Sequence, residues 1–314
     1  MFSGKNISIL ILTKNGGTIF EKSLSALMRC DGADEAEILI VDSGSTDDTV
    51  ITAKRYENVV VHSIDPSEFN HGTTRNLGVR LASRKIVVML VQDAVPTTVD
   101  FLERLVSPLT DSQVAGVYGK QVPGETAQFP ERHCLAMTYG NALIRKETVG
   151  KAKLSDVFFS NVCAAIRREV LVRHPFPEGI LMSEDQIWAK EILGNGHVIV
   201  YQPAAAVIHS HHYDWATLFR RYFDSGASLR GITADAFTDM IRYEIHYLSA
   251  GYRSARSIRE FTSLLIHETV RAAGILTGKN YPLLPKSWTL KLSLHARFWD
   301  YCSRPEAAQR QAFV

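Results

Sequence analysis

Short apolar runs alternate with helix-forming stretches through the first hundred residues, and this alternation limits the folds open to the chain. The apolar runs cover residues 7–12, 37–41, 59–62 and 86–91. Helical patterns lie around Leu24 and Leu27, from residues 45–47 onward, and over residues 73–82. Because strand-like runs separated by ~10–15-residue helical stretches are typical of βαβ units, the sequence predicts a parallel sheet. Right-handed crossovers then bring the carboxyl ends of the strands to one edge, where open α/β sheets bind ligands.

The second half of the chain predicts further strands and then helices only. We expect loops with partial helix over residues 123–155, a strand over 162–166, a helix over 184–193, and strands over 197–201 and 205–208. From Trp215 onward the pattern is helical, with an apolar stripe of Ile258, Phe261, Leu265, Ala272 and Ile275. This change predicts an α/β domain over residues 1–214 and a helical region over residues 215–314.

Charge is distributed unevenly between these two parts. Residues 1–214 carry 21 Lys and Arg against 25 Asp and Glu, a net charge of −4, and residues 215–314 carry 14 against 8, a net charge of +6. A basic C-terminal region indicates contact with an anionic partner, either phosphates or a membrane surface. A solvated basic face is the open alternative. The total charge of +2 is too small to indicate nucleic-acid binding.

The cysteines and the apolar runs bear on the location of the protein. Cys30, Cys134, Cys163 and Cys302 lie far apart and form no CxxC pair, which argues against a disulfide framework or a zinc site and fits a reducing cytoplasm. The polar N-terminus does not resemble a signal peptide, and no apolar run approaches the ~18 residues that span a bilayer. We expect a cytoplasmic protein that can touch a membrane surface without crossing it.

An acidic residue closes the second apolar run and is followed by a glycine turn. The segment reads Val41-Asp42-Ser43-Gly44-Ser45-Thr46-Asp47-Asp48. A carboxylate at a strand end can accept a hydrogen bond from a pyrimidine imide or a ribose hydroxyl, and the residues after it can cap a helix that faces the same crevice. The alternative is an ordinary strand–turn–helix with Ser45 or Thr46 as N-cap. The chain has neither GxGxxG after its first strand nor GxxxxGK(S/T), so it lacks the main signs of a dehydrogenase and of a P-loop phosphotransferase.

Three segments in this order resemble the first half of the family-2 glycosyltransferases with the GT-A fold. They are Thr13-Lys14-Asn15 after the first strand, the segment 41–47, and Arg75-Asn76-Leu77-Gly78. The resemblance implies a Rossmann-like mixed α/β sheet flanked by helices, with a C-terminal helical extension. It also implies that Asp42 contacts the base of a nucleoside diphosphate sugar donor, that Thr13 lies near that base, and that Arg75 lies beside the nucleotide.

Two strings are similar to those of bacterial rhamnosyltransferases within this family. One is Phe69-Asn70-His71-Gly72-Thr73-Thr74-Arg75-Asn76, and the other is Gln92-Asp93-Ala94. The similarity implies dTDP-β-L-rhamnose as the donor and an α-linkage formed by inversion. It makes Gln92 a nucleotide-binding candidate and His71 a further site candidate, although His71 also fits the first turn of a helix. UDP-hexose and UDP-N-acetylhexosamine donors are the alternative, since Asp42 could bind the imide that thymine and uracil share.

The family's Asp-x-Asp metal motif is replaced here by Val91-Gln92-Asp93, in which only the second acid remains. By resemblance Asp93 binds a divalent cation, Mg²⁺ or Mn²⁺, which stabilises the charge of a departing nucleoside diphosphate. A strand-end turn acid is the plainer interpretation of Asp93 alone. In GT-A enzymes a histidine in the region of residues 209–212 often binds the metal. His209 is the expected ligand, and His211, which would share its face of an extended chain, is the second candidate.

Paired acids stand at the predicted start of the helix over residues 184–193. In the family the second acid of such a pair is the catalytic base, which implies that Asp185 takes the proton of the acceptor hydroxyl as the new C–O bond forms. Favourable placement of acids at a helix N-terminus is the alternative, and it suits Glu184 better than Asp185. Glu184 is a further site candidate.

The resemblance therefore predicts an inverting glycosyltransferase that acts on a hydroxyl of a bacterial surface polysaccharide, such as an O antigen, or of a lipid-linked oligosaccharide. A sugar-1-phosphate nucleotidyltransferase would need a glycine-rich basic loop, which Lys14-Asn15-Gly16-Gly17 matches poorly. A non-catalytic carbohydrate-binding protein would leave Asp42, Asp93, Asp185 and His209 without a shared role. We expect the C-terminal helices either to contact an anionic membrane surface, or to pack on the α/β domain or on the second subunit of a homodimer.

Overall fold

The computed structural model describes residues 2–147, 153–230, 237–296, 298 and 299. These residues form two compact units. The described residues of the ranges 1–126, 135–178 and 184–210 make up the first unit, and those of 127–134, 179–183 and 211–314 make up the second. The second unit thus includes two short segments from the earlier part of the chain, which the sequence pattern does not indicate.

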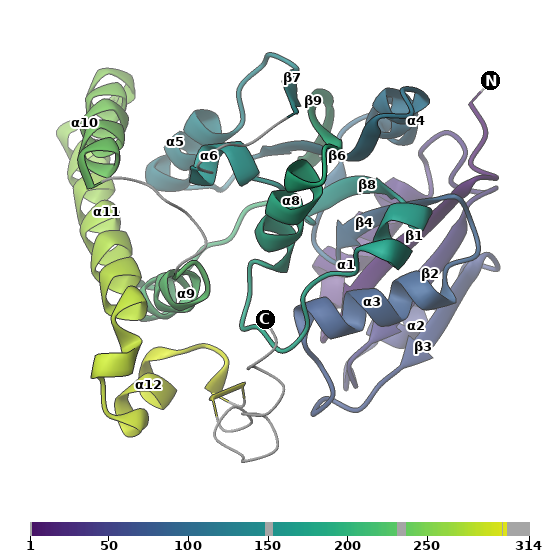
Figure 1. Ribbon diagram of the computed structural model, residues 1–314, viewed down its shortest axis with the longest axis horizontal. Coiled ribbons are helices and arrows are strands. Elements are labelled where there is room, and N and C mark those ends of the chain that lie inside the picture. Colours follow the sequence, from purple (N-terminus) through teal and green to yellow (C-terminus); the bar gives the residue numbers. More distant parts are fainter. Residues whose placement is uncertain (1, 148–152, 231–236, 297, 300–314) are drawn as a thin grey trace. The chain divides into compact units, whose positions relative to one another are not determined.

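A mixed sheet forms the centre of the first unit (Figure 1). Its four consecutive parallel strands are β1 (Ile7–Thr13), β2 (Glu37–Asp42), β3 (Val59–Ser63) and β4 (Ile86–Val91). The other strands are β5 (Val95–Pro96), β6 (Val114–Val122), β7 (Ile144–Lys146), β8 (Cys163–Arg167) and β9 (Val198–Ile208). The order is β3-β2-β1-β4-β8-β6-β9-β5, with β7 paired to β9. Since β8 is antiparallel to both β4 and β6, and β6 is parallel to β9, strands β1 to β4, β6 and β9 point the same way.

Helices cover both faces of this sheet, because side chains alternate between the faces along each strand. Ile9 and Ile38 pack with α1 (Gly17–Leu27), α2 (Thr49–Ala53) and α4 (Phe101–Val106). Leu10 and Leu39 pack with α3 (His71–Leu81), α7 (Arg168–Arg173) and α8 (Glu184–Gly194), of which Trp188 is fully buried. Shorter elements are η1 (Ser107–Thr110) and α6 (Leu154–Val157), and α5 (Phe129–Thr138) runs from the second unit into the first.

The strands and helices predicted for the first hundred residues are confirmed, with one correction. The helix after β2 begins at Thr49 with Asp48 as its N-cap, so the prediction that Ser45, Thr46 or Asp47 caps it is wrong. Further along, residues 197–201 and 205–208 lie in one strand, β9, rather than two. Strand β6 and helix α4 are absent from the predicted elements.

From Trp215 onward, every regular element that the structure describes in the second unit is a helix, as predicted. They are α9 (Trp215–Ser228), α10 (Phe237–Ser254), α11 (Ile258–Lys279), η2 (Tyr281–Leu283) and α12 (Lys286–Leu292). Glycines let α9 and α11 approach closely, since a Cβ on Gly274 or Gly278 would collide with the carbonyl oxygens of Phe219 and Phe223. Figure 1 shows α10 running alongside α11. None of the helices in the described ranges is long and apolar enough to cross a bilayer.

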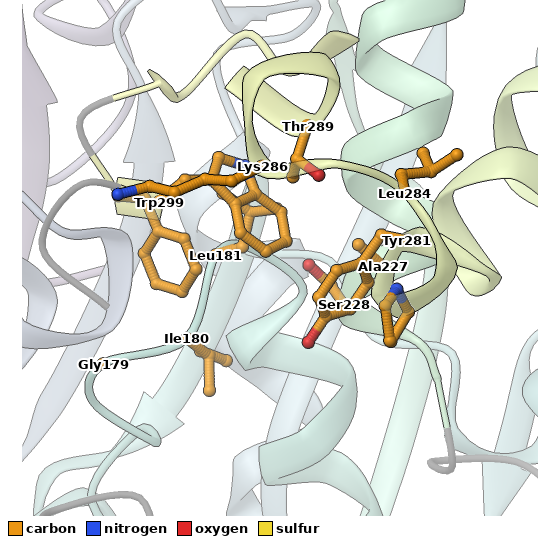
Figure 2. A pocket seen from close by; sticks show the side chains of 12 residues that line it. Gly179, Ile180, Leu181, Ala227, Ser228, Tyr281, Leu284, Lys286, Thr289 and Trp299 are labelled. Atoms are coloured by element: carbon orange, nitrogen blue, oxygen red, sulfur yellow. The ribbon is translucent and has the colours of Figure 1, made fainter. Parts of the chain in front are cut away.

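The second unit also contains a cavity of about 460 Å³ (Figure 2). Its lining comes from residues 179–181, from the end of α9, and from the segment that contains Tyr281, Phe298 and Trp299. This lining includes none of the residues that the sequence predicts for the active site. Most of those residues lie in the first unit.

Candidate active site

The strand ends of the first unit bring the predicted donor-site residues to one edge of the sheet. Thr13 lies opposite Asp42 in the pairing of β1 with β2, and Leu12 lies opposite Val91 in the pairing of β1 with β4. Gln92 and Asp93 directly follow β4, and His209 directly follows β9, which points the same way. Residues from separate motifs therefore collect at the carboxyl edge of the sheet, where open α/β folds bind ligands.

Asp42 is almost fully buried at this edge, with 2% of its surface exposed. Its Oδ1 accepts hydrogen bonds from the Thr13 hydroxyl at 2.8 Å and the Ser45 hydroxyl at 2.6 Å. Its Oδ2 accepts from the backbone N–H groups of Gly44 and Ser45 at 3.0 and 2.8 Å. All four lone-pair positions of the carboxylate thus accept hydrogen bonds from residues at the end of β1 and in the turn after β2. For Asp42 to contact a nucleobase, the Thr13 or Ser45 hydroxyl has to turn away from it.

Gln92 ties the end of β4 to the loop that follows β1. Its Oε1 accepts from the N–H of Lys14 at 2.9 Å, and its Nε2 donates to the Lys14 carbonyl at 3.3 Å. The Lys14 ammonium in turn donates to the carbonyls of Ser43 and Gly44 at 2.8 and 2.6 Å. The loops after β1, β2 and β4 therefore form one hydrogen-bonded edge.

Asp93 and His209 form a pair suited to a divalent cation. Asp93 Oδ1 lies 3.6 Å from His209 Nε2, and the two side chains are 22% and 10% exposed. Ligand atoms bound to one small cation lie about 3 Å apart, so a small closure would let both atoms bind it. His211 comes two residues after His209, at the start of the second unit, where its N–H donates to the carboxylate of Glu131.

A second hydrogen bond orients the His209 ring. Gln121, near the end of β6, has its Oε1 2.9 Å from His209 Nδ1. Because a carbonyl oxygen only accepts, Nδ1 carries a proton, and Nε2, which faces Asp93, is the ring nitrogen that can bind a cation in the neutral imidazole. The Gln121 amide nitrogen donates to the Tyr139 hydroxyl and, at 3.0 Å, to the Ser160 hydroxyl. Gln121 therefore holds His209 in the tautomer that binds a metal through Nε2.

Glu184 and Asp185 begin α8, the first fully buried and the second partly buried. Arg75 donates to Glu184 at 2.6 Å, and the side chains of this ion pair are 8% and 6% exposed. Asn161 serves both acids, since its N–H donates to Asp185 at 3.1 Å and its side-chain amide donates to Glu184 at 3.3 Å. The N–H of Gln186 also donates to Asp185, at 2.9 Å. Arg75, predicted to lie beside the nucleotide, meets Glu184 in this structure.

The two carboxyl groups differ in their affinity for a proton. Burial disfavours the ionised form of Glu184, but the charge of Arg75 and neighbouring donors outweigh it, so the pKa of Glu184 is lowered. Burial, together with the adjacent Glu184 charge, raises the pKa of Asp185 from 3.8 to about 7. Two neighbouring acids whose environments separate their pKa values are suited to acid–base chemistry, and a base works best with a pKa near neutrality.

His71 occupies the first turn of α3, which confirms the helix-start interpretation of this residue. The preceding Asn70 caps the helix by accepting from the N–H groups of Gly72 and Thr73. The His71 ring contacts Phe69 with a centroid separation of 5.0 Å. His71 is among the groups whose electrostatic effect lowers the pKa of Glu184.

Four polar residues of this network lie outside the set that the motifs predict: Gln121, Tyr139, Ser160 and Asn161. Asn161 is 1% exposed, and its Oδ1 has no hydrogen-bond partner among the described residues. Gln121 stands near the end of an apolar strand, and Ser160 and Asn161 stand just before another. Ser160 and Asn161 directly precede the strand predicted over residues 162–166, so their position beside it could have identified them, whereas Gln121 lies in a strand that the sequence does not predict.

The topology of the sheet is that of a GT-A glycosyltransferase. The family model described as "Glycosyl transferase family 2" matches residues 8–174. The chain belongs to this family.

Two curated relatives and one solved structure are informative. The chain is 29% identical over 310 residues to the O-antigen chain rhamnosyltransferase RfbN of Salmonella typhimurium, covering 94% of this chain and 96% of the relative. It is 31% identical over 311 residues to the O-antigen chain rhamnosyltransferase WbaN of Salmonella anatum, with the same coverage of 94% and 96%. Its fold is similar to that of the mannosyltransferase PcManGT from Pyrobaculum calidifontis in complex with GDP-Man and Mn²⁺. That match has a TM-score of 0.57 at 19% identity and covers 95% of this chain and 86% of the other.

Proposed function

We propose that this glycosyltransferase transfers L-rhamnose from dTDP-β-L-rhamnose, with inversion, to a hydroxyl of an O-antigen-like or lipid-linked glycan. The main support for this donor is the sequence identity of 29% and 31%, over nearly the whole chain, to two O-antigen chain rhamnosyltransferases. The resemblance of the 69–76 and 92–94 strings to rhamnosyltransferases supports the same donor. Within the Glu184–Asp185 pair only Asp185 has a raised pKa, and one base at this position supports direct displacement.

Asp93 and His209 would hold a divalent cation, with His211 as a further ligand two residues along the chain. The chemistry of the pair fits, because an imidazole and a carboxylate are suitable ligands for Mn²⁺, and His209 Nε2 lies 3.6 Å from the Asp93 carboxylate. Bound Mg²⁺ or Mn²⁺ neutralises the charge that develops on the departing diphosphate. Because Val91 stands where the family has an acid, we expect the protein to hold the ion weakly until donor phosphates add their own oxygens.

Asp185 acts as the general base. The N–H groups of Asn161 and Gln186 fix its carboxylate, and Glu184 raises its proton affinity from the adjacent position. It accepts the proton of the acceptor hydroxyl while that oxygen bonds to the anomeric carbon and the bond to the nucleoside diphosphate breaks. Glu184 does not compete for this proton, because Arg75 favours its ionised form.

A donor panel tests the proposed donor. The protein is mixed with Mn²⁺, a lipid-linked glycan acceptor, and dTDP-β-L-rhamnose, UDP-glucose or UDP-N-acetylglucosamine. We expect release of dTDP and a deoxyhexose mass increment on the glycan, with thermal stabilisation of the protein by the rhamnose donor. Transfer from the UDP sugars and none from dTDP-rhamnose would reject the rhamnose donor and leave the family assignment unchanged.

Replacing Gln121 by leucine is expected to weaken Mn²⁺ binding about 10–100-fold, the usual effect of losing the partner that orients a metal-bound histidine. The measurement is Mn²⁺ electron paramagnetic resonance on the protein with and without dTDP, which reports binding independently of turnover. Gln121→Glu keeps an acceptor for His209 Nδ1 and should retain wild-type affinity. Equal affinity of Gln121→Leu and wild type would show that Gln121 does not position His209 for the ion.

A further inference from the structure

Helix α11 turns an apolar face to solvent in the second unit. Ile258, Leu265, Ile266 and Leu276 on this face are 78%, 40%, 46% and 55% exposed. The other exposed positions from residue 258 to 276 are threonine, alanine and a single arginine, Arg259. At 1.5 Å per residue these positions form a strip about 27 Å long. We call this strip the α11 face.

The opposite side of the same helix carries its charges. Glu268 is 6% exposed and accepts from the guanidinium of Arg271 at 2.5 Å and from the His267 ring at 2.9 Å. Arg271 also pairs with Glu244 of α10. The ion pairs of Glu268 and Arg271 are thus directed inward, whereas Ile258, Leu265, Ile266 and Leu276 are directed outward even though Leu264 of the same helix is buried. A surface helix ordinarily has its charged side chains outward and its apolar side chains inward. The α11 face therefore has the composition of an interaction surface.

Basic residues stand at both ends of the α11 face. Arg253 and Arg256 precede the helix, Arg259 lies in its first turn, and all three are exposed. Lys286 and Lys291 follow the helix and are also exposed.

Exposed apolar groups accompany the basic residues, and exposed acids do not. Leu283 and Trp288, which lie among the basic residues after the helix, are 82% and 59% exposed. The acids between residues 242 and 296 are Glu244, Glu260 and Glu268, and each forms an ion pair with an arginine. The outward charge of this segment is therefore positive.

This combination fits an anionic lipid surface better than a second copy of the chain. Apolar side chains can enter the headgroup boundary of a bilayer while lysine and arginine meet lipid phosphates and tryptophan lies at the interface. In a symmetric pair of chains, parallel and antiparallel packing of two α11 faces alike would set basic ends against basic ends. The paired acids of residues 242–296 offer no compensation for that repulsion.

We propose that the α11 face and the basic residues at its ends dock the protein on the surface of a bilayer that contains anionic phospholipid. The helix lies in the plane of that surface, as an amphipathic helix does. This docking is independent of the donor sugar, so it stands whether or not the donor is dTDP-rhamnose.

Flotation of the full chain with vesicles tests this docking. We expect flotation with vesicles of phosphatidylcholine mixed with phosphatidylglycerol, none with phosphatidylcholine alone, and weaker flotation at high salt because ions screen the attraction. Replacing Arg253, Arg256 and Arg259 together by glutamine should lower partitioning about 10²-fold. The Leu265→Glu/Leu276→Glu variant should not float, because it places charge in the apolar strip.

Matched substitutions elsewhere in the chain serve as controls. Ile51→Glu changes an isoleucine of α2 that is 61% exposed. A triple change of Arg80, Arg84 and Lys85 to glutamine removes the same charge from exposed positions in and after α3. Both controls should float like wild type, and thermal unfolding should show every variant folded.

Three results would overturn the proposal. The first is the absence of flotation at low salt, and the second is flotation of Leu265→Glu/Leu276→Glu equal to that of wild type. The third is a dimer seen by light scattering that this variant loses, in a protein that does not float. That result would assign the α11 face to a second copy of the chain.

Discussion

Replacing Asp185 by asparagine should lower kcat by about 10²–10⁴-fold, the range expected when a general base is lost, with donor affinity nearly unchanged. Asparagine has the shape of aspartate and can still accept from the N–H of Asn161 or Gln186, but it cannot take a proton from the acceptor. Steady-state kinetics against acceptor and a thermal-shift titration with donor separate the two effects. Wild-type turnover in Asp185→Asn would exclude Asp185 as the general base.

The pH profile of the same reaction provides an independent check. Because the pKa of Asp185 is raised to about 7, its ionised form is lost as the pH falls through neutrality. The wild-type kcat/KM should therefore fall about tenfold per pH unit below that pKa. The residual rate of Asp185→Asn should lack this acid limb. Glu169→Gln, a change of an exposed acid on α7, should keep both the rate and the limb.

Removing Arg75 should produce the largest loss of stability. In Arg75→Ala the buried carboxylate of Glu184 has lost its ion-pair partner, and breaking a buried pair in this way costs about 3–5 kcal/mol. Urea unfolding followed by tryptophan fluorescence measures the change. Trp188, one turn beyond Glu184 on α8 and fully buried, is a suitable reporter. An Arg75→Ala protein as stable as wild type would show that the ion pair does not matter for folding.

The double variant Arg75→Ala/Glu184→Gln separates two roles of Arg75. Removing the uncompensated charge should recover most of the lost stability. If Arg75 also contacts the nucleotide, as the family resemblance implies, donor affinity stays low in the double variant. Recovery of both stability and donor affinity would contradict that nucleotide-binding role and leave Arg75 as the partner of Glu184 alone.

The parallel part of the sheet could be predicted because its signals are local. Strands β1 to β4 are short apolar runs with turn residues behind them, and strand direction alone places Thr13, Asp42 and Asp93 at one edge. Strand β6 has no such signal, because Gly116, Gly119 and Lys120 break its apolar run. Both glycines are needed by distant contacts. A Cβ on Gly119 would meet the carbonyl of Ala205, and one on Gly116 would press against Trp188.

Partners within the site are harder to predict than its members. Arg75 and Glu184 were both site candidates, yet they are separated by 109 positions in the sequence, and no pattern indicates that they form an ion pair. The hydrogen bonds that the Asp42 carboxylate accepts depend on the conformation of the turn after β2, which the position of the strand does not determine. Sequence motifs predict which side chains lie at an edge of the sheet. The tertiary packing determines which of these side chains contact one another.

The predicted stripe on α11 shows a related limit. Its five members were grouped by helical spacing, but Ile258, Leu265 and Ala272 are exposed, while Phe261 and Ile275 are partly buried. Arg271, which is not a member of this stripe, lies inward in ion pairs with two glutamates. Periodicity identifies residues that share a side of a helix. It does not determine whether that side faces the protein or its surroundings, because the buried ion pairs form with α10 and within α11 itself.

Residues 160 and 161 limit where this enzyme can be joined to a relative in a chimeric protein, because both belong to hydrogen-bond networks of the site. Gln121 bonds to Ser160 and to His209, so Ser160 is connected to the cation pair. Asn161, the next residue, holds both Glu184 and Asp185. A chimera with its junction between residues 121 and 209 takes the hydrogen-bond partners of this network from two different proteins, whose side chains are not matched to each other. A junction after residue 210 leaves every one of these bonds within a single parent, so the helices that follow can be exchanged without dividing the network.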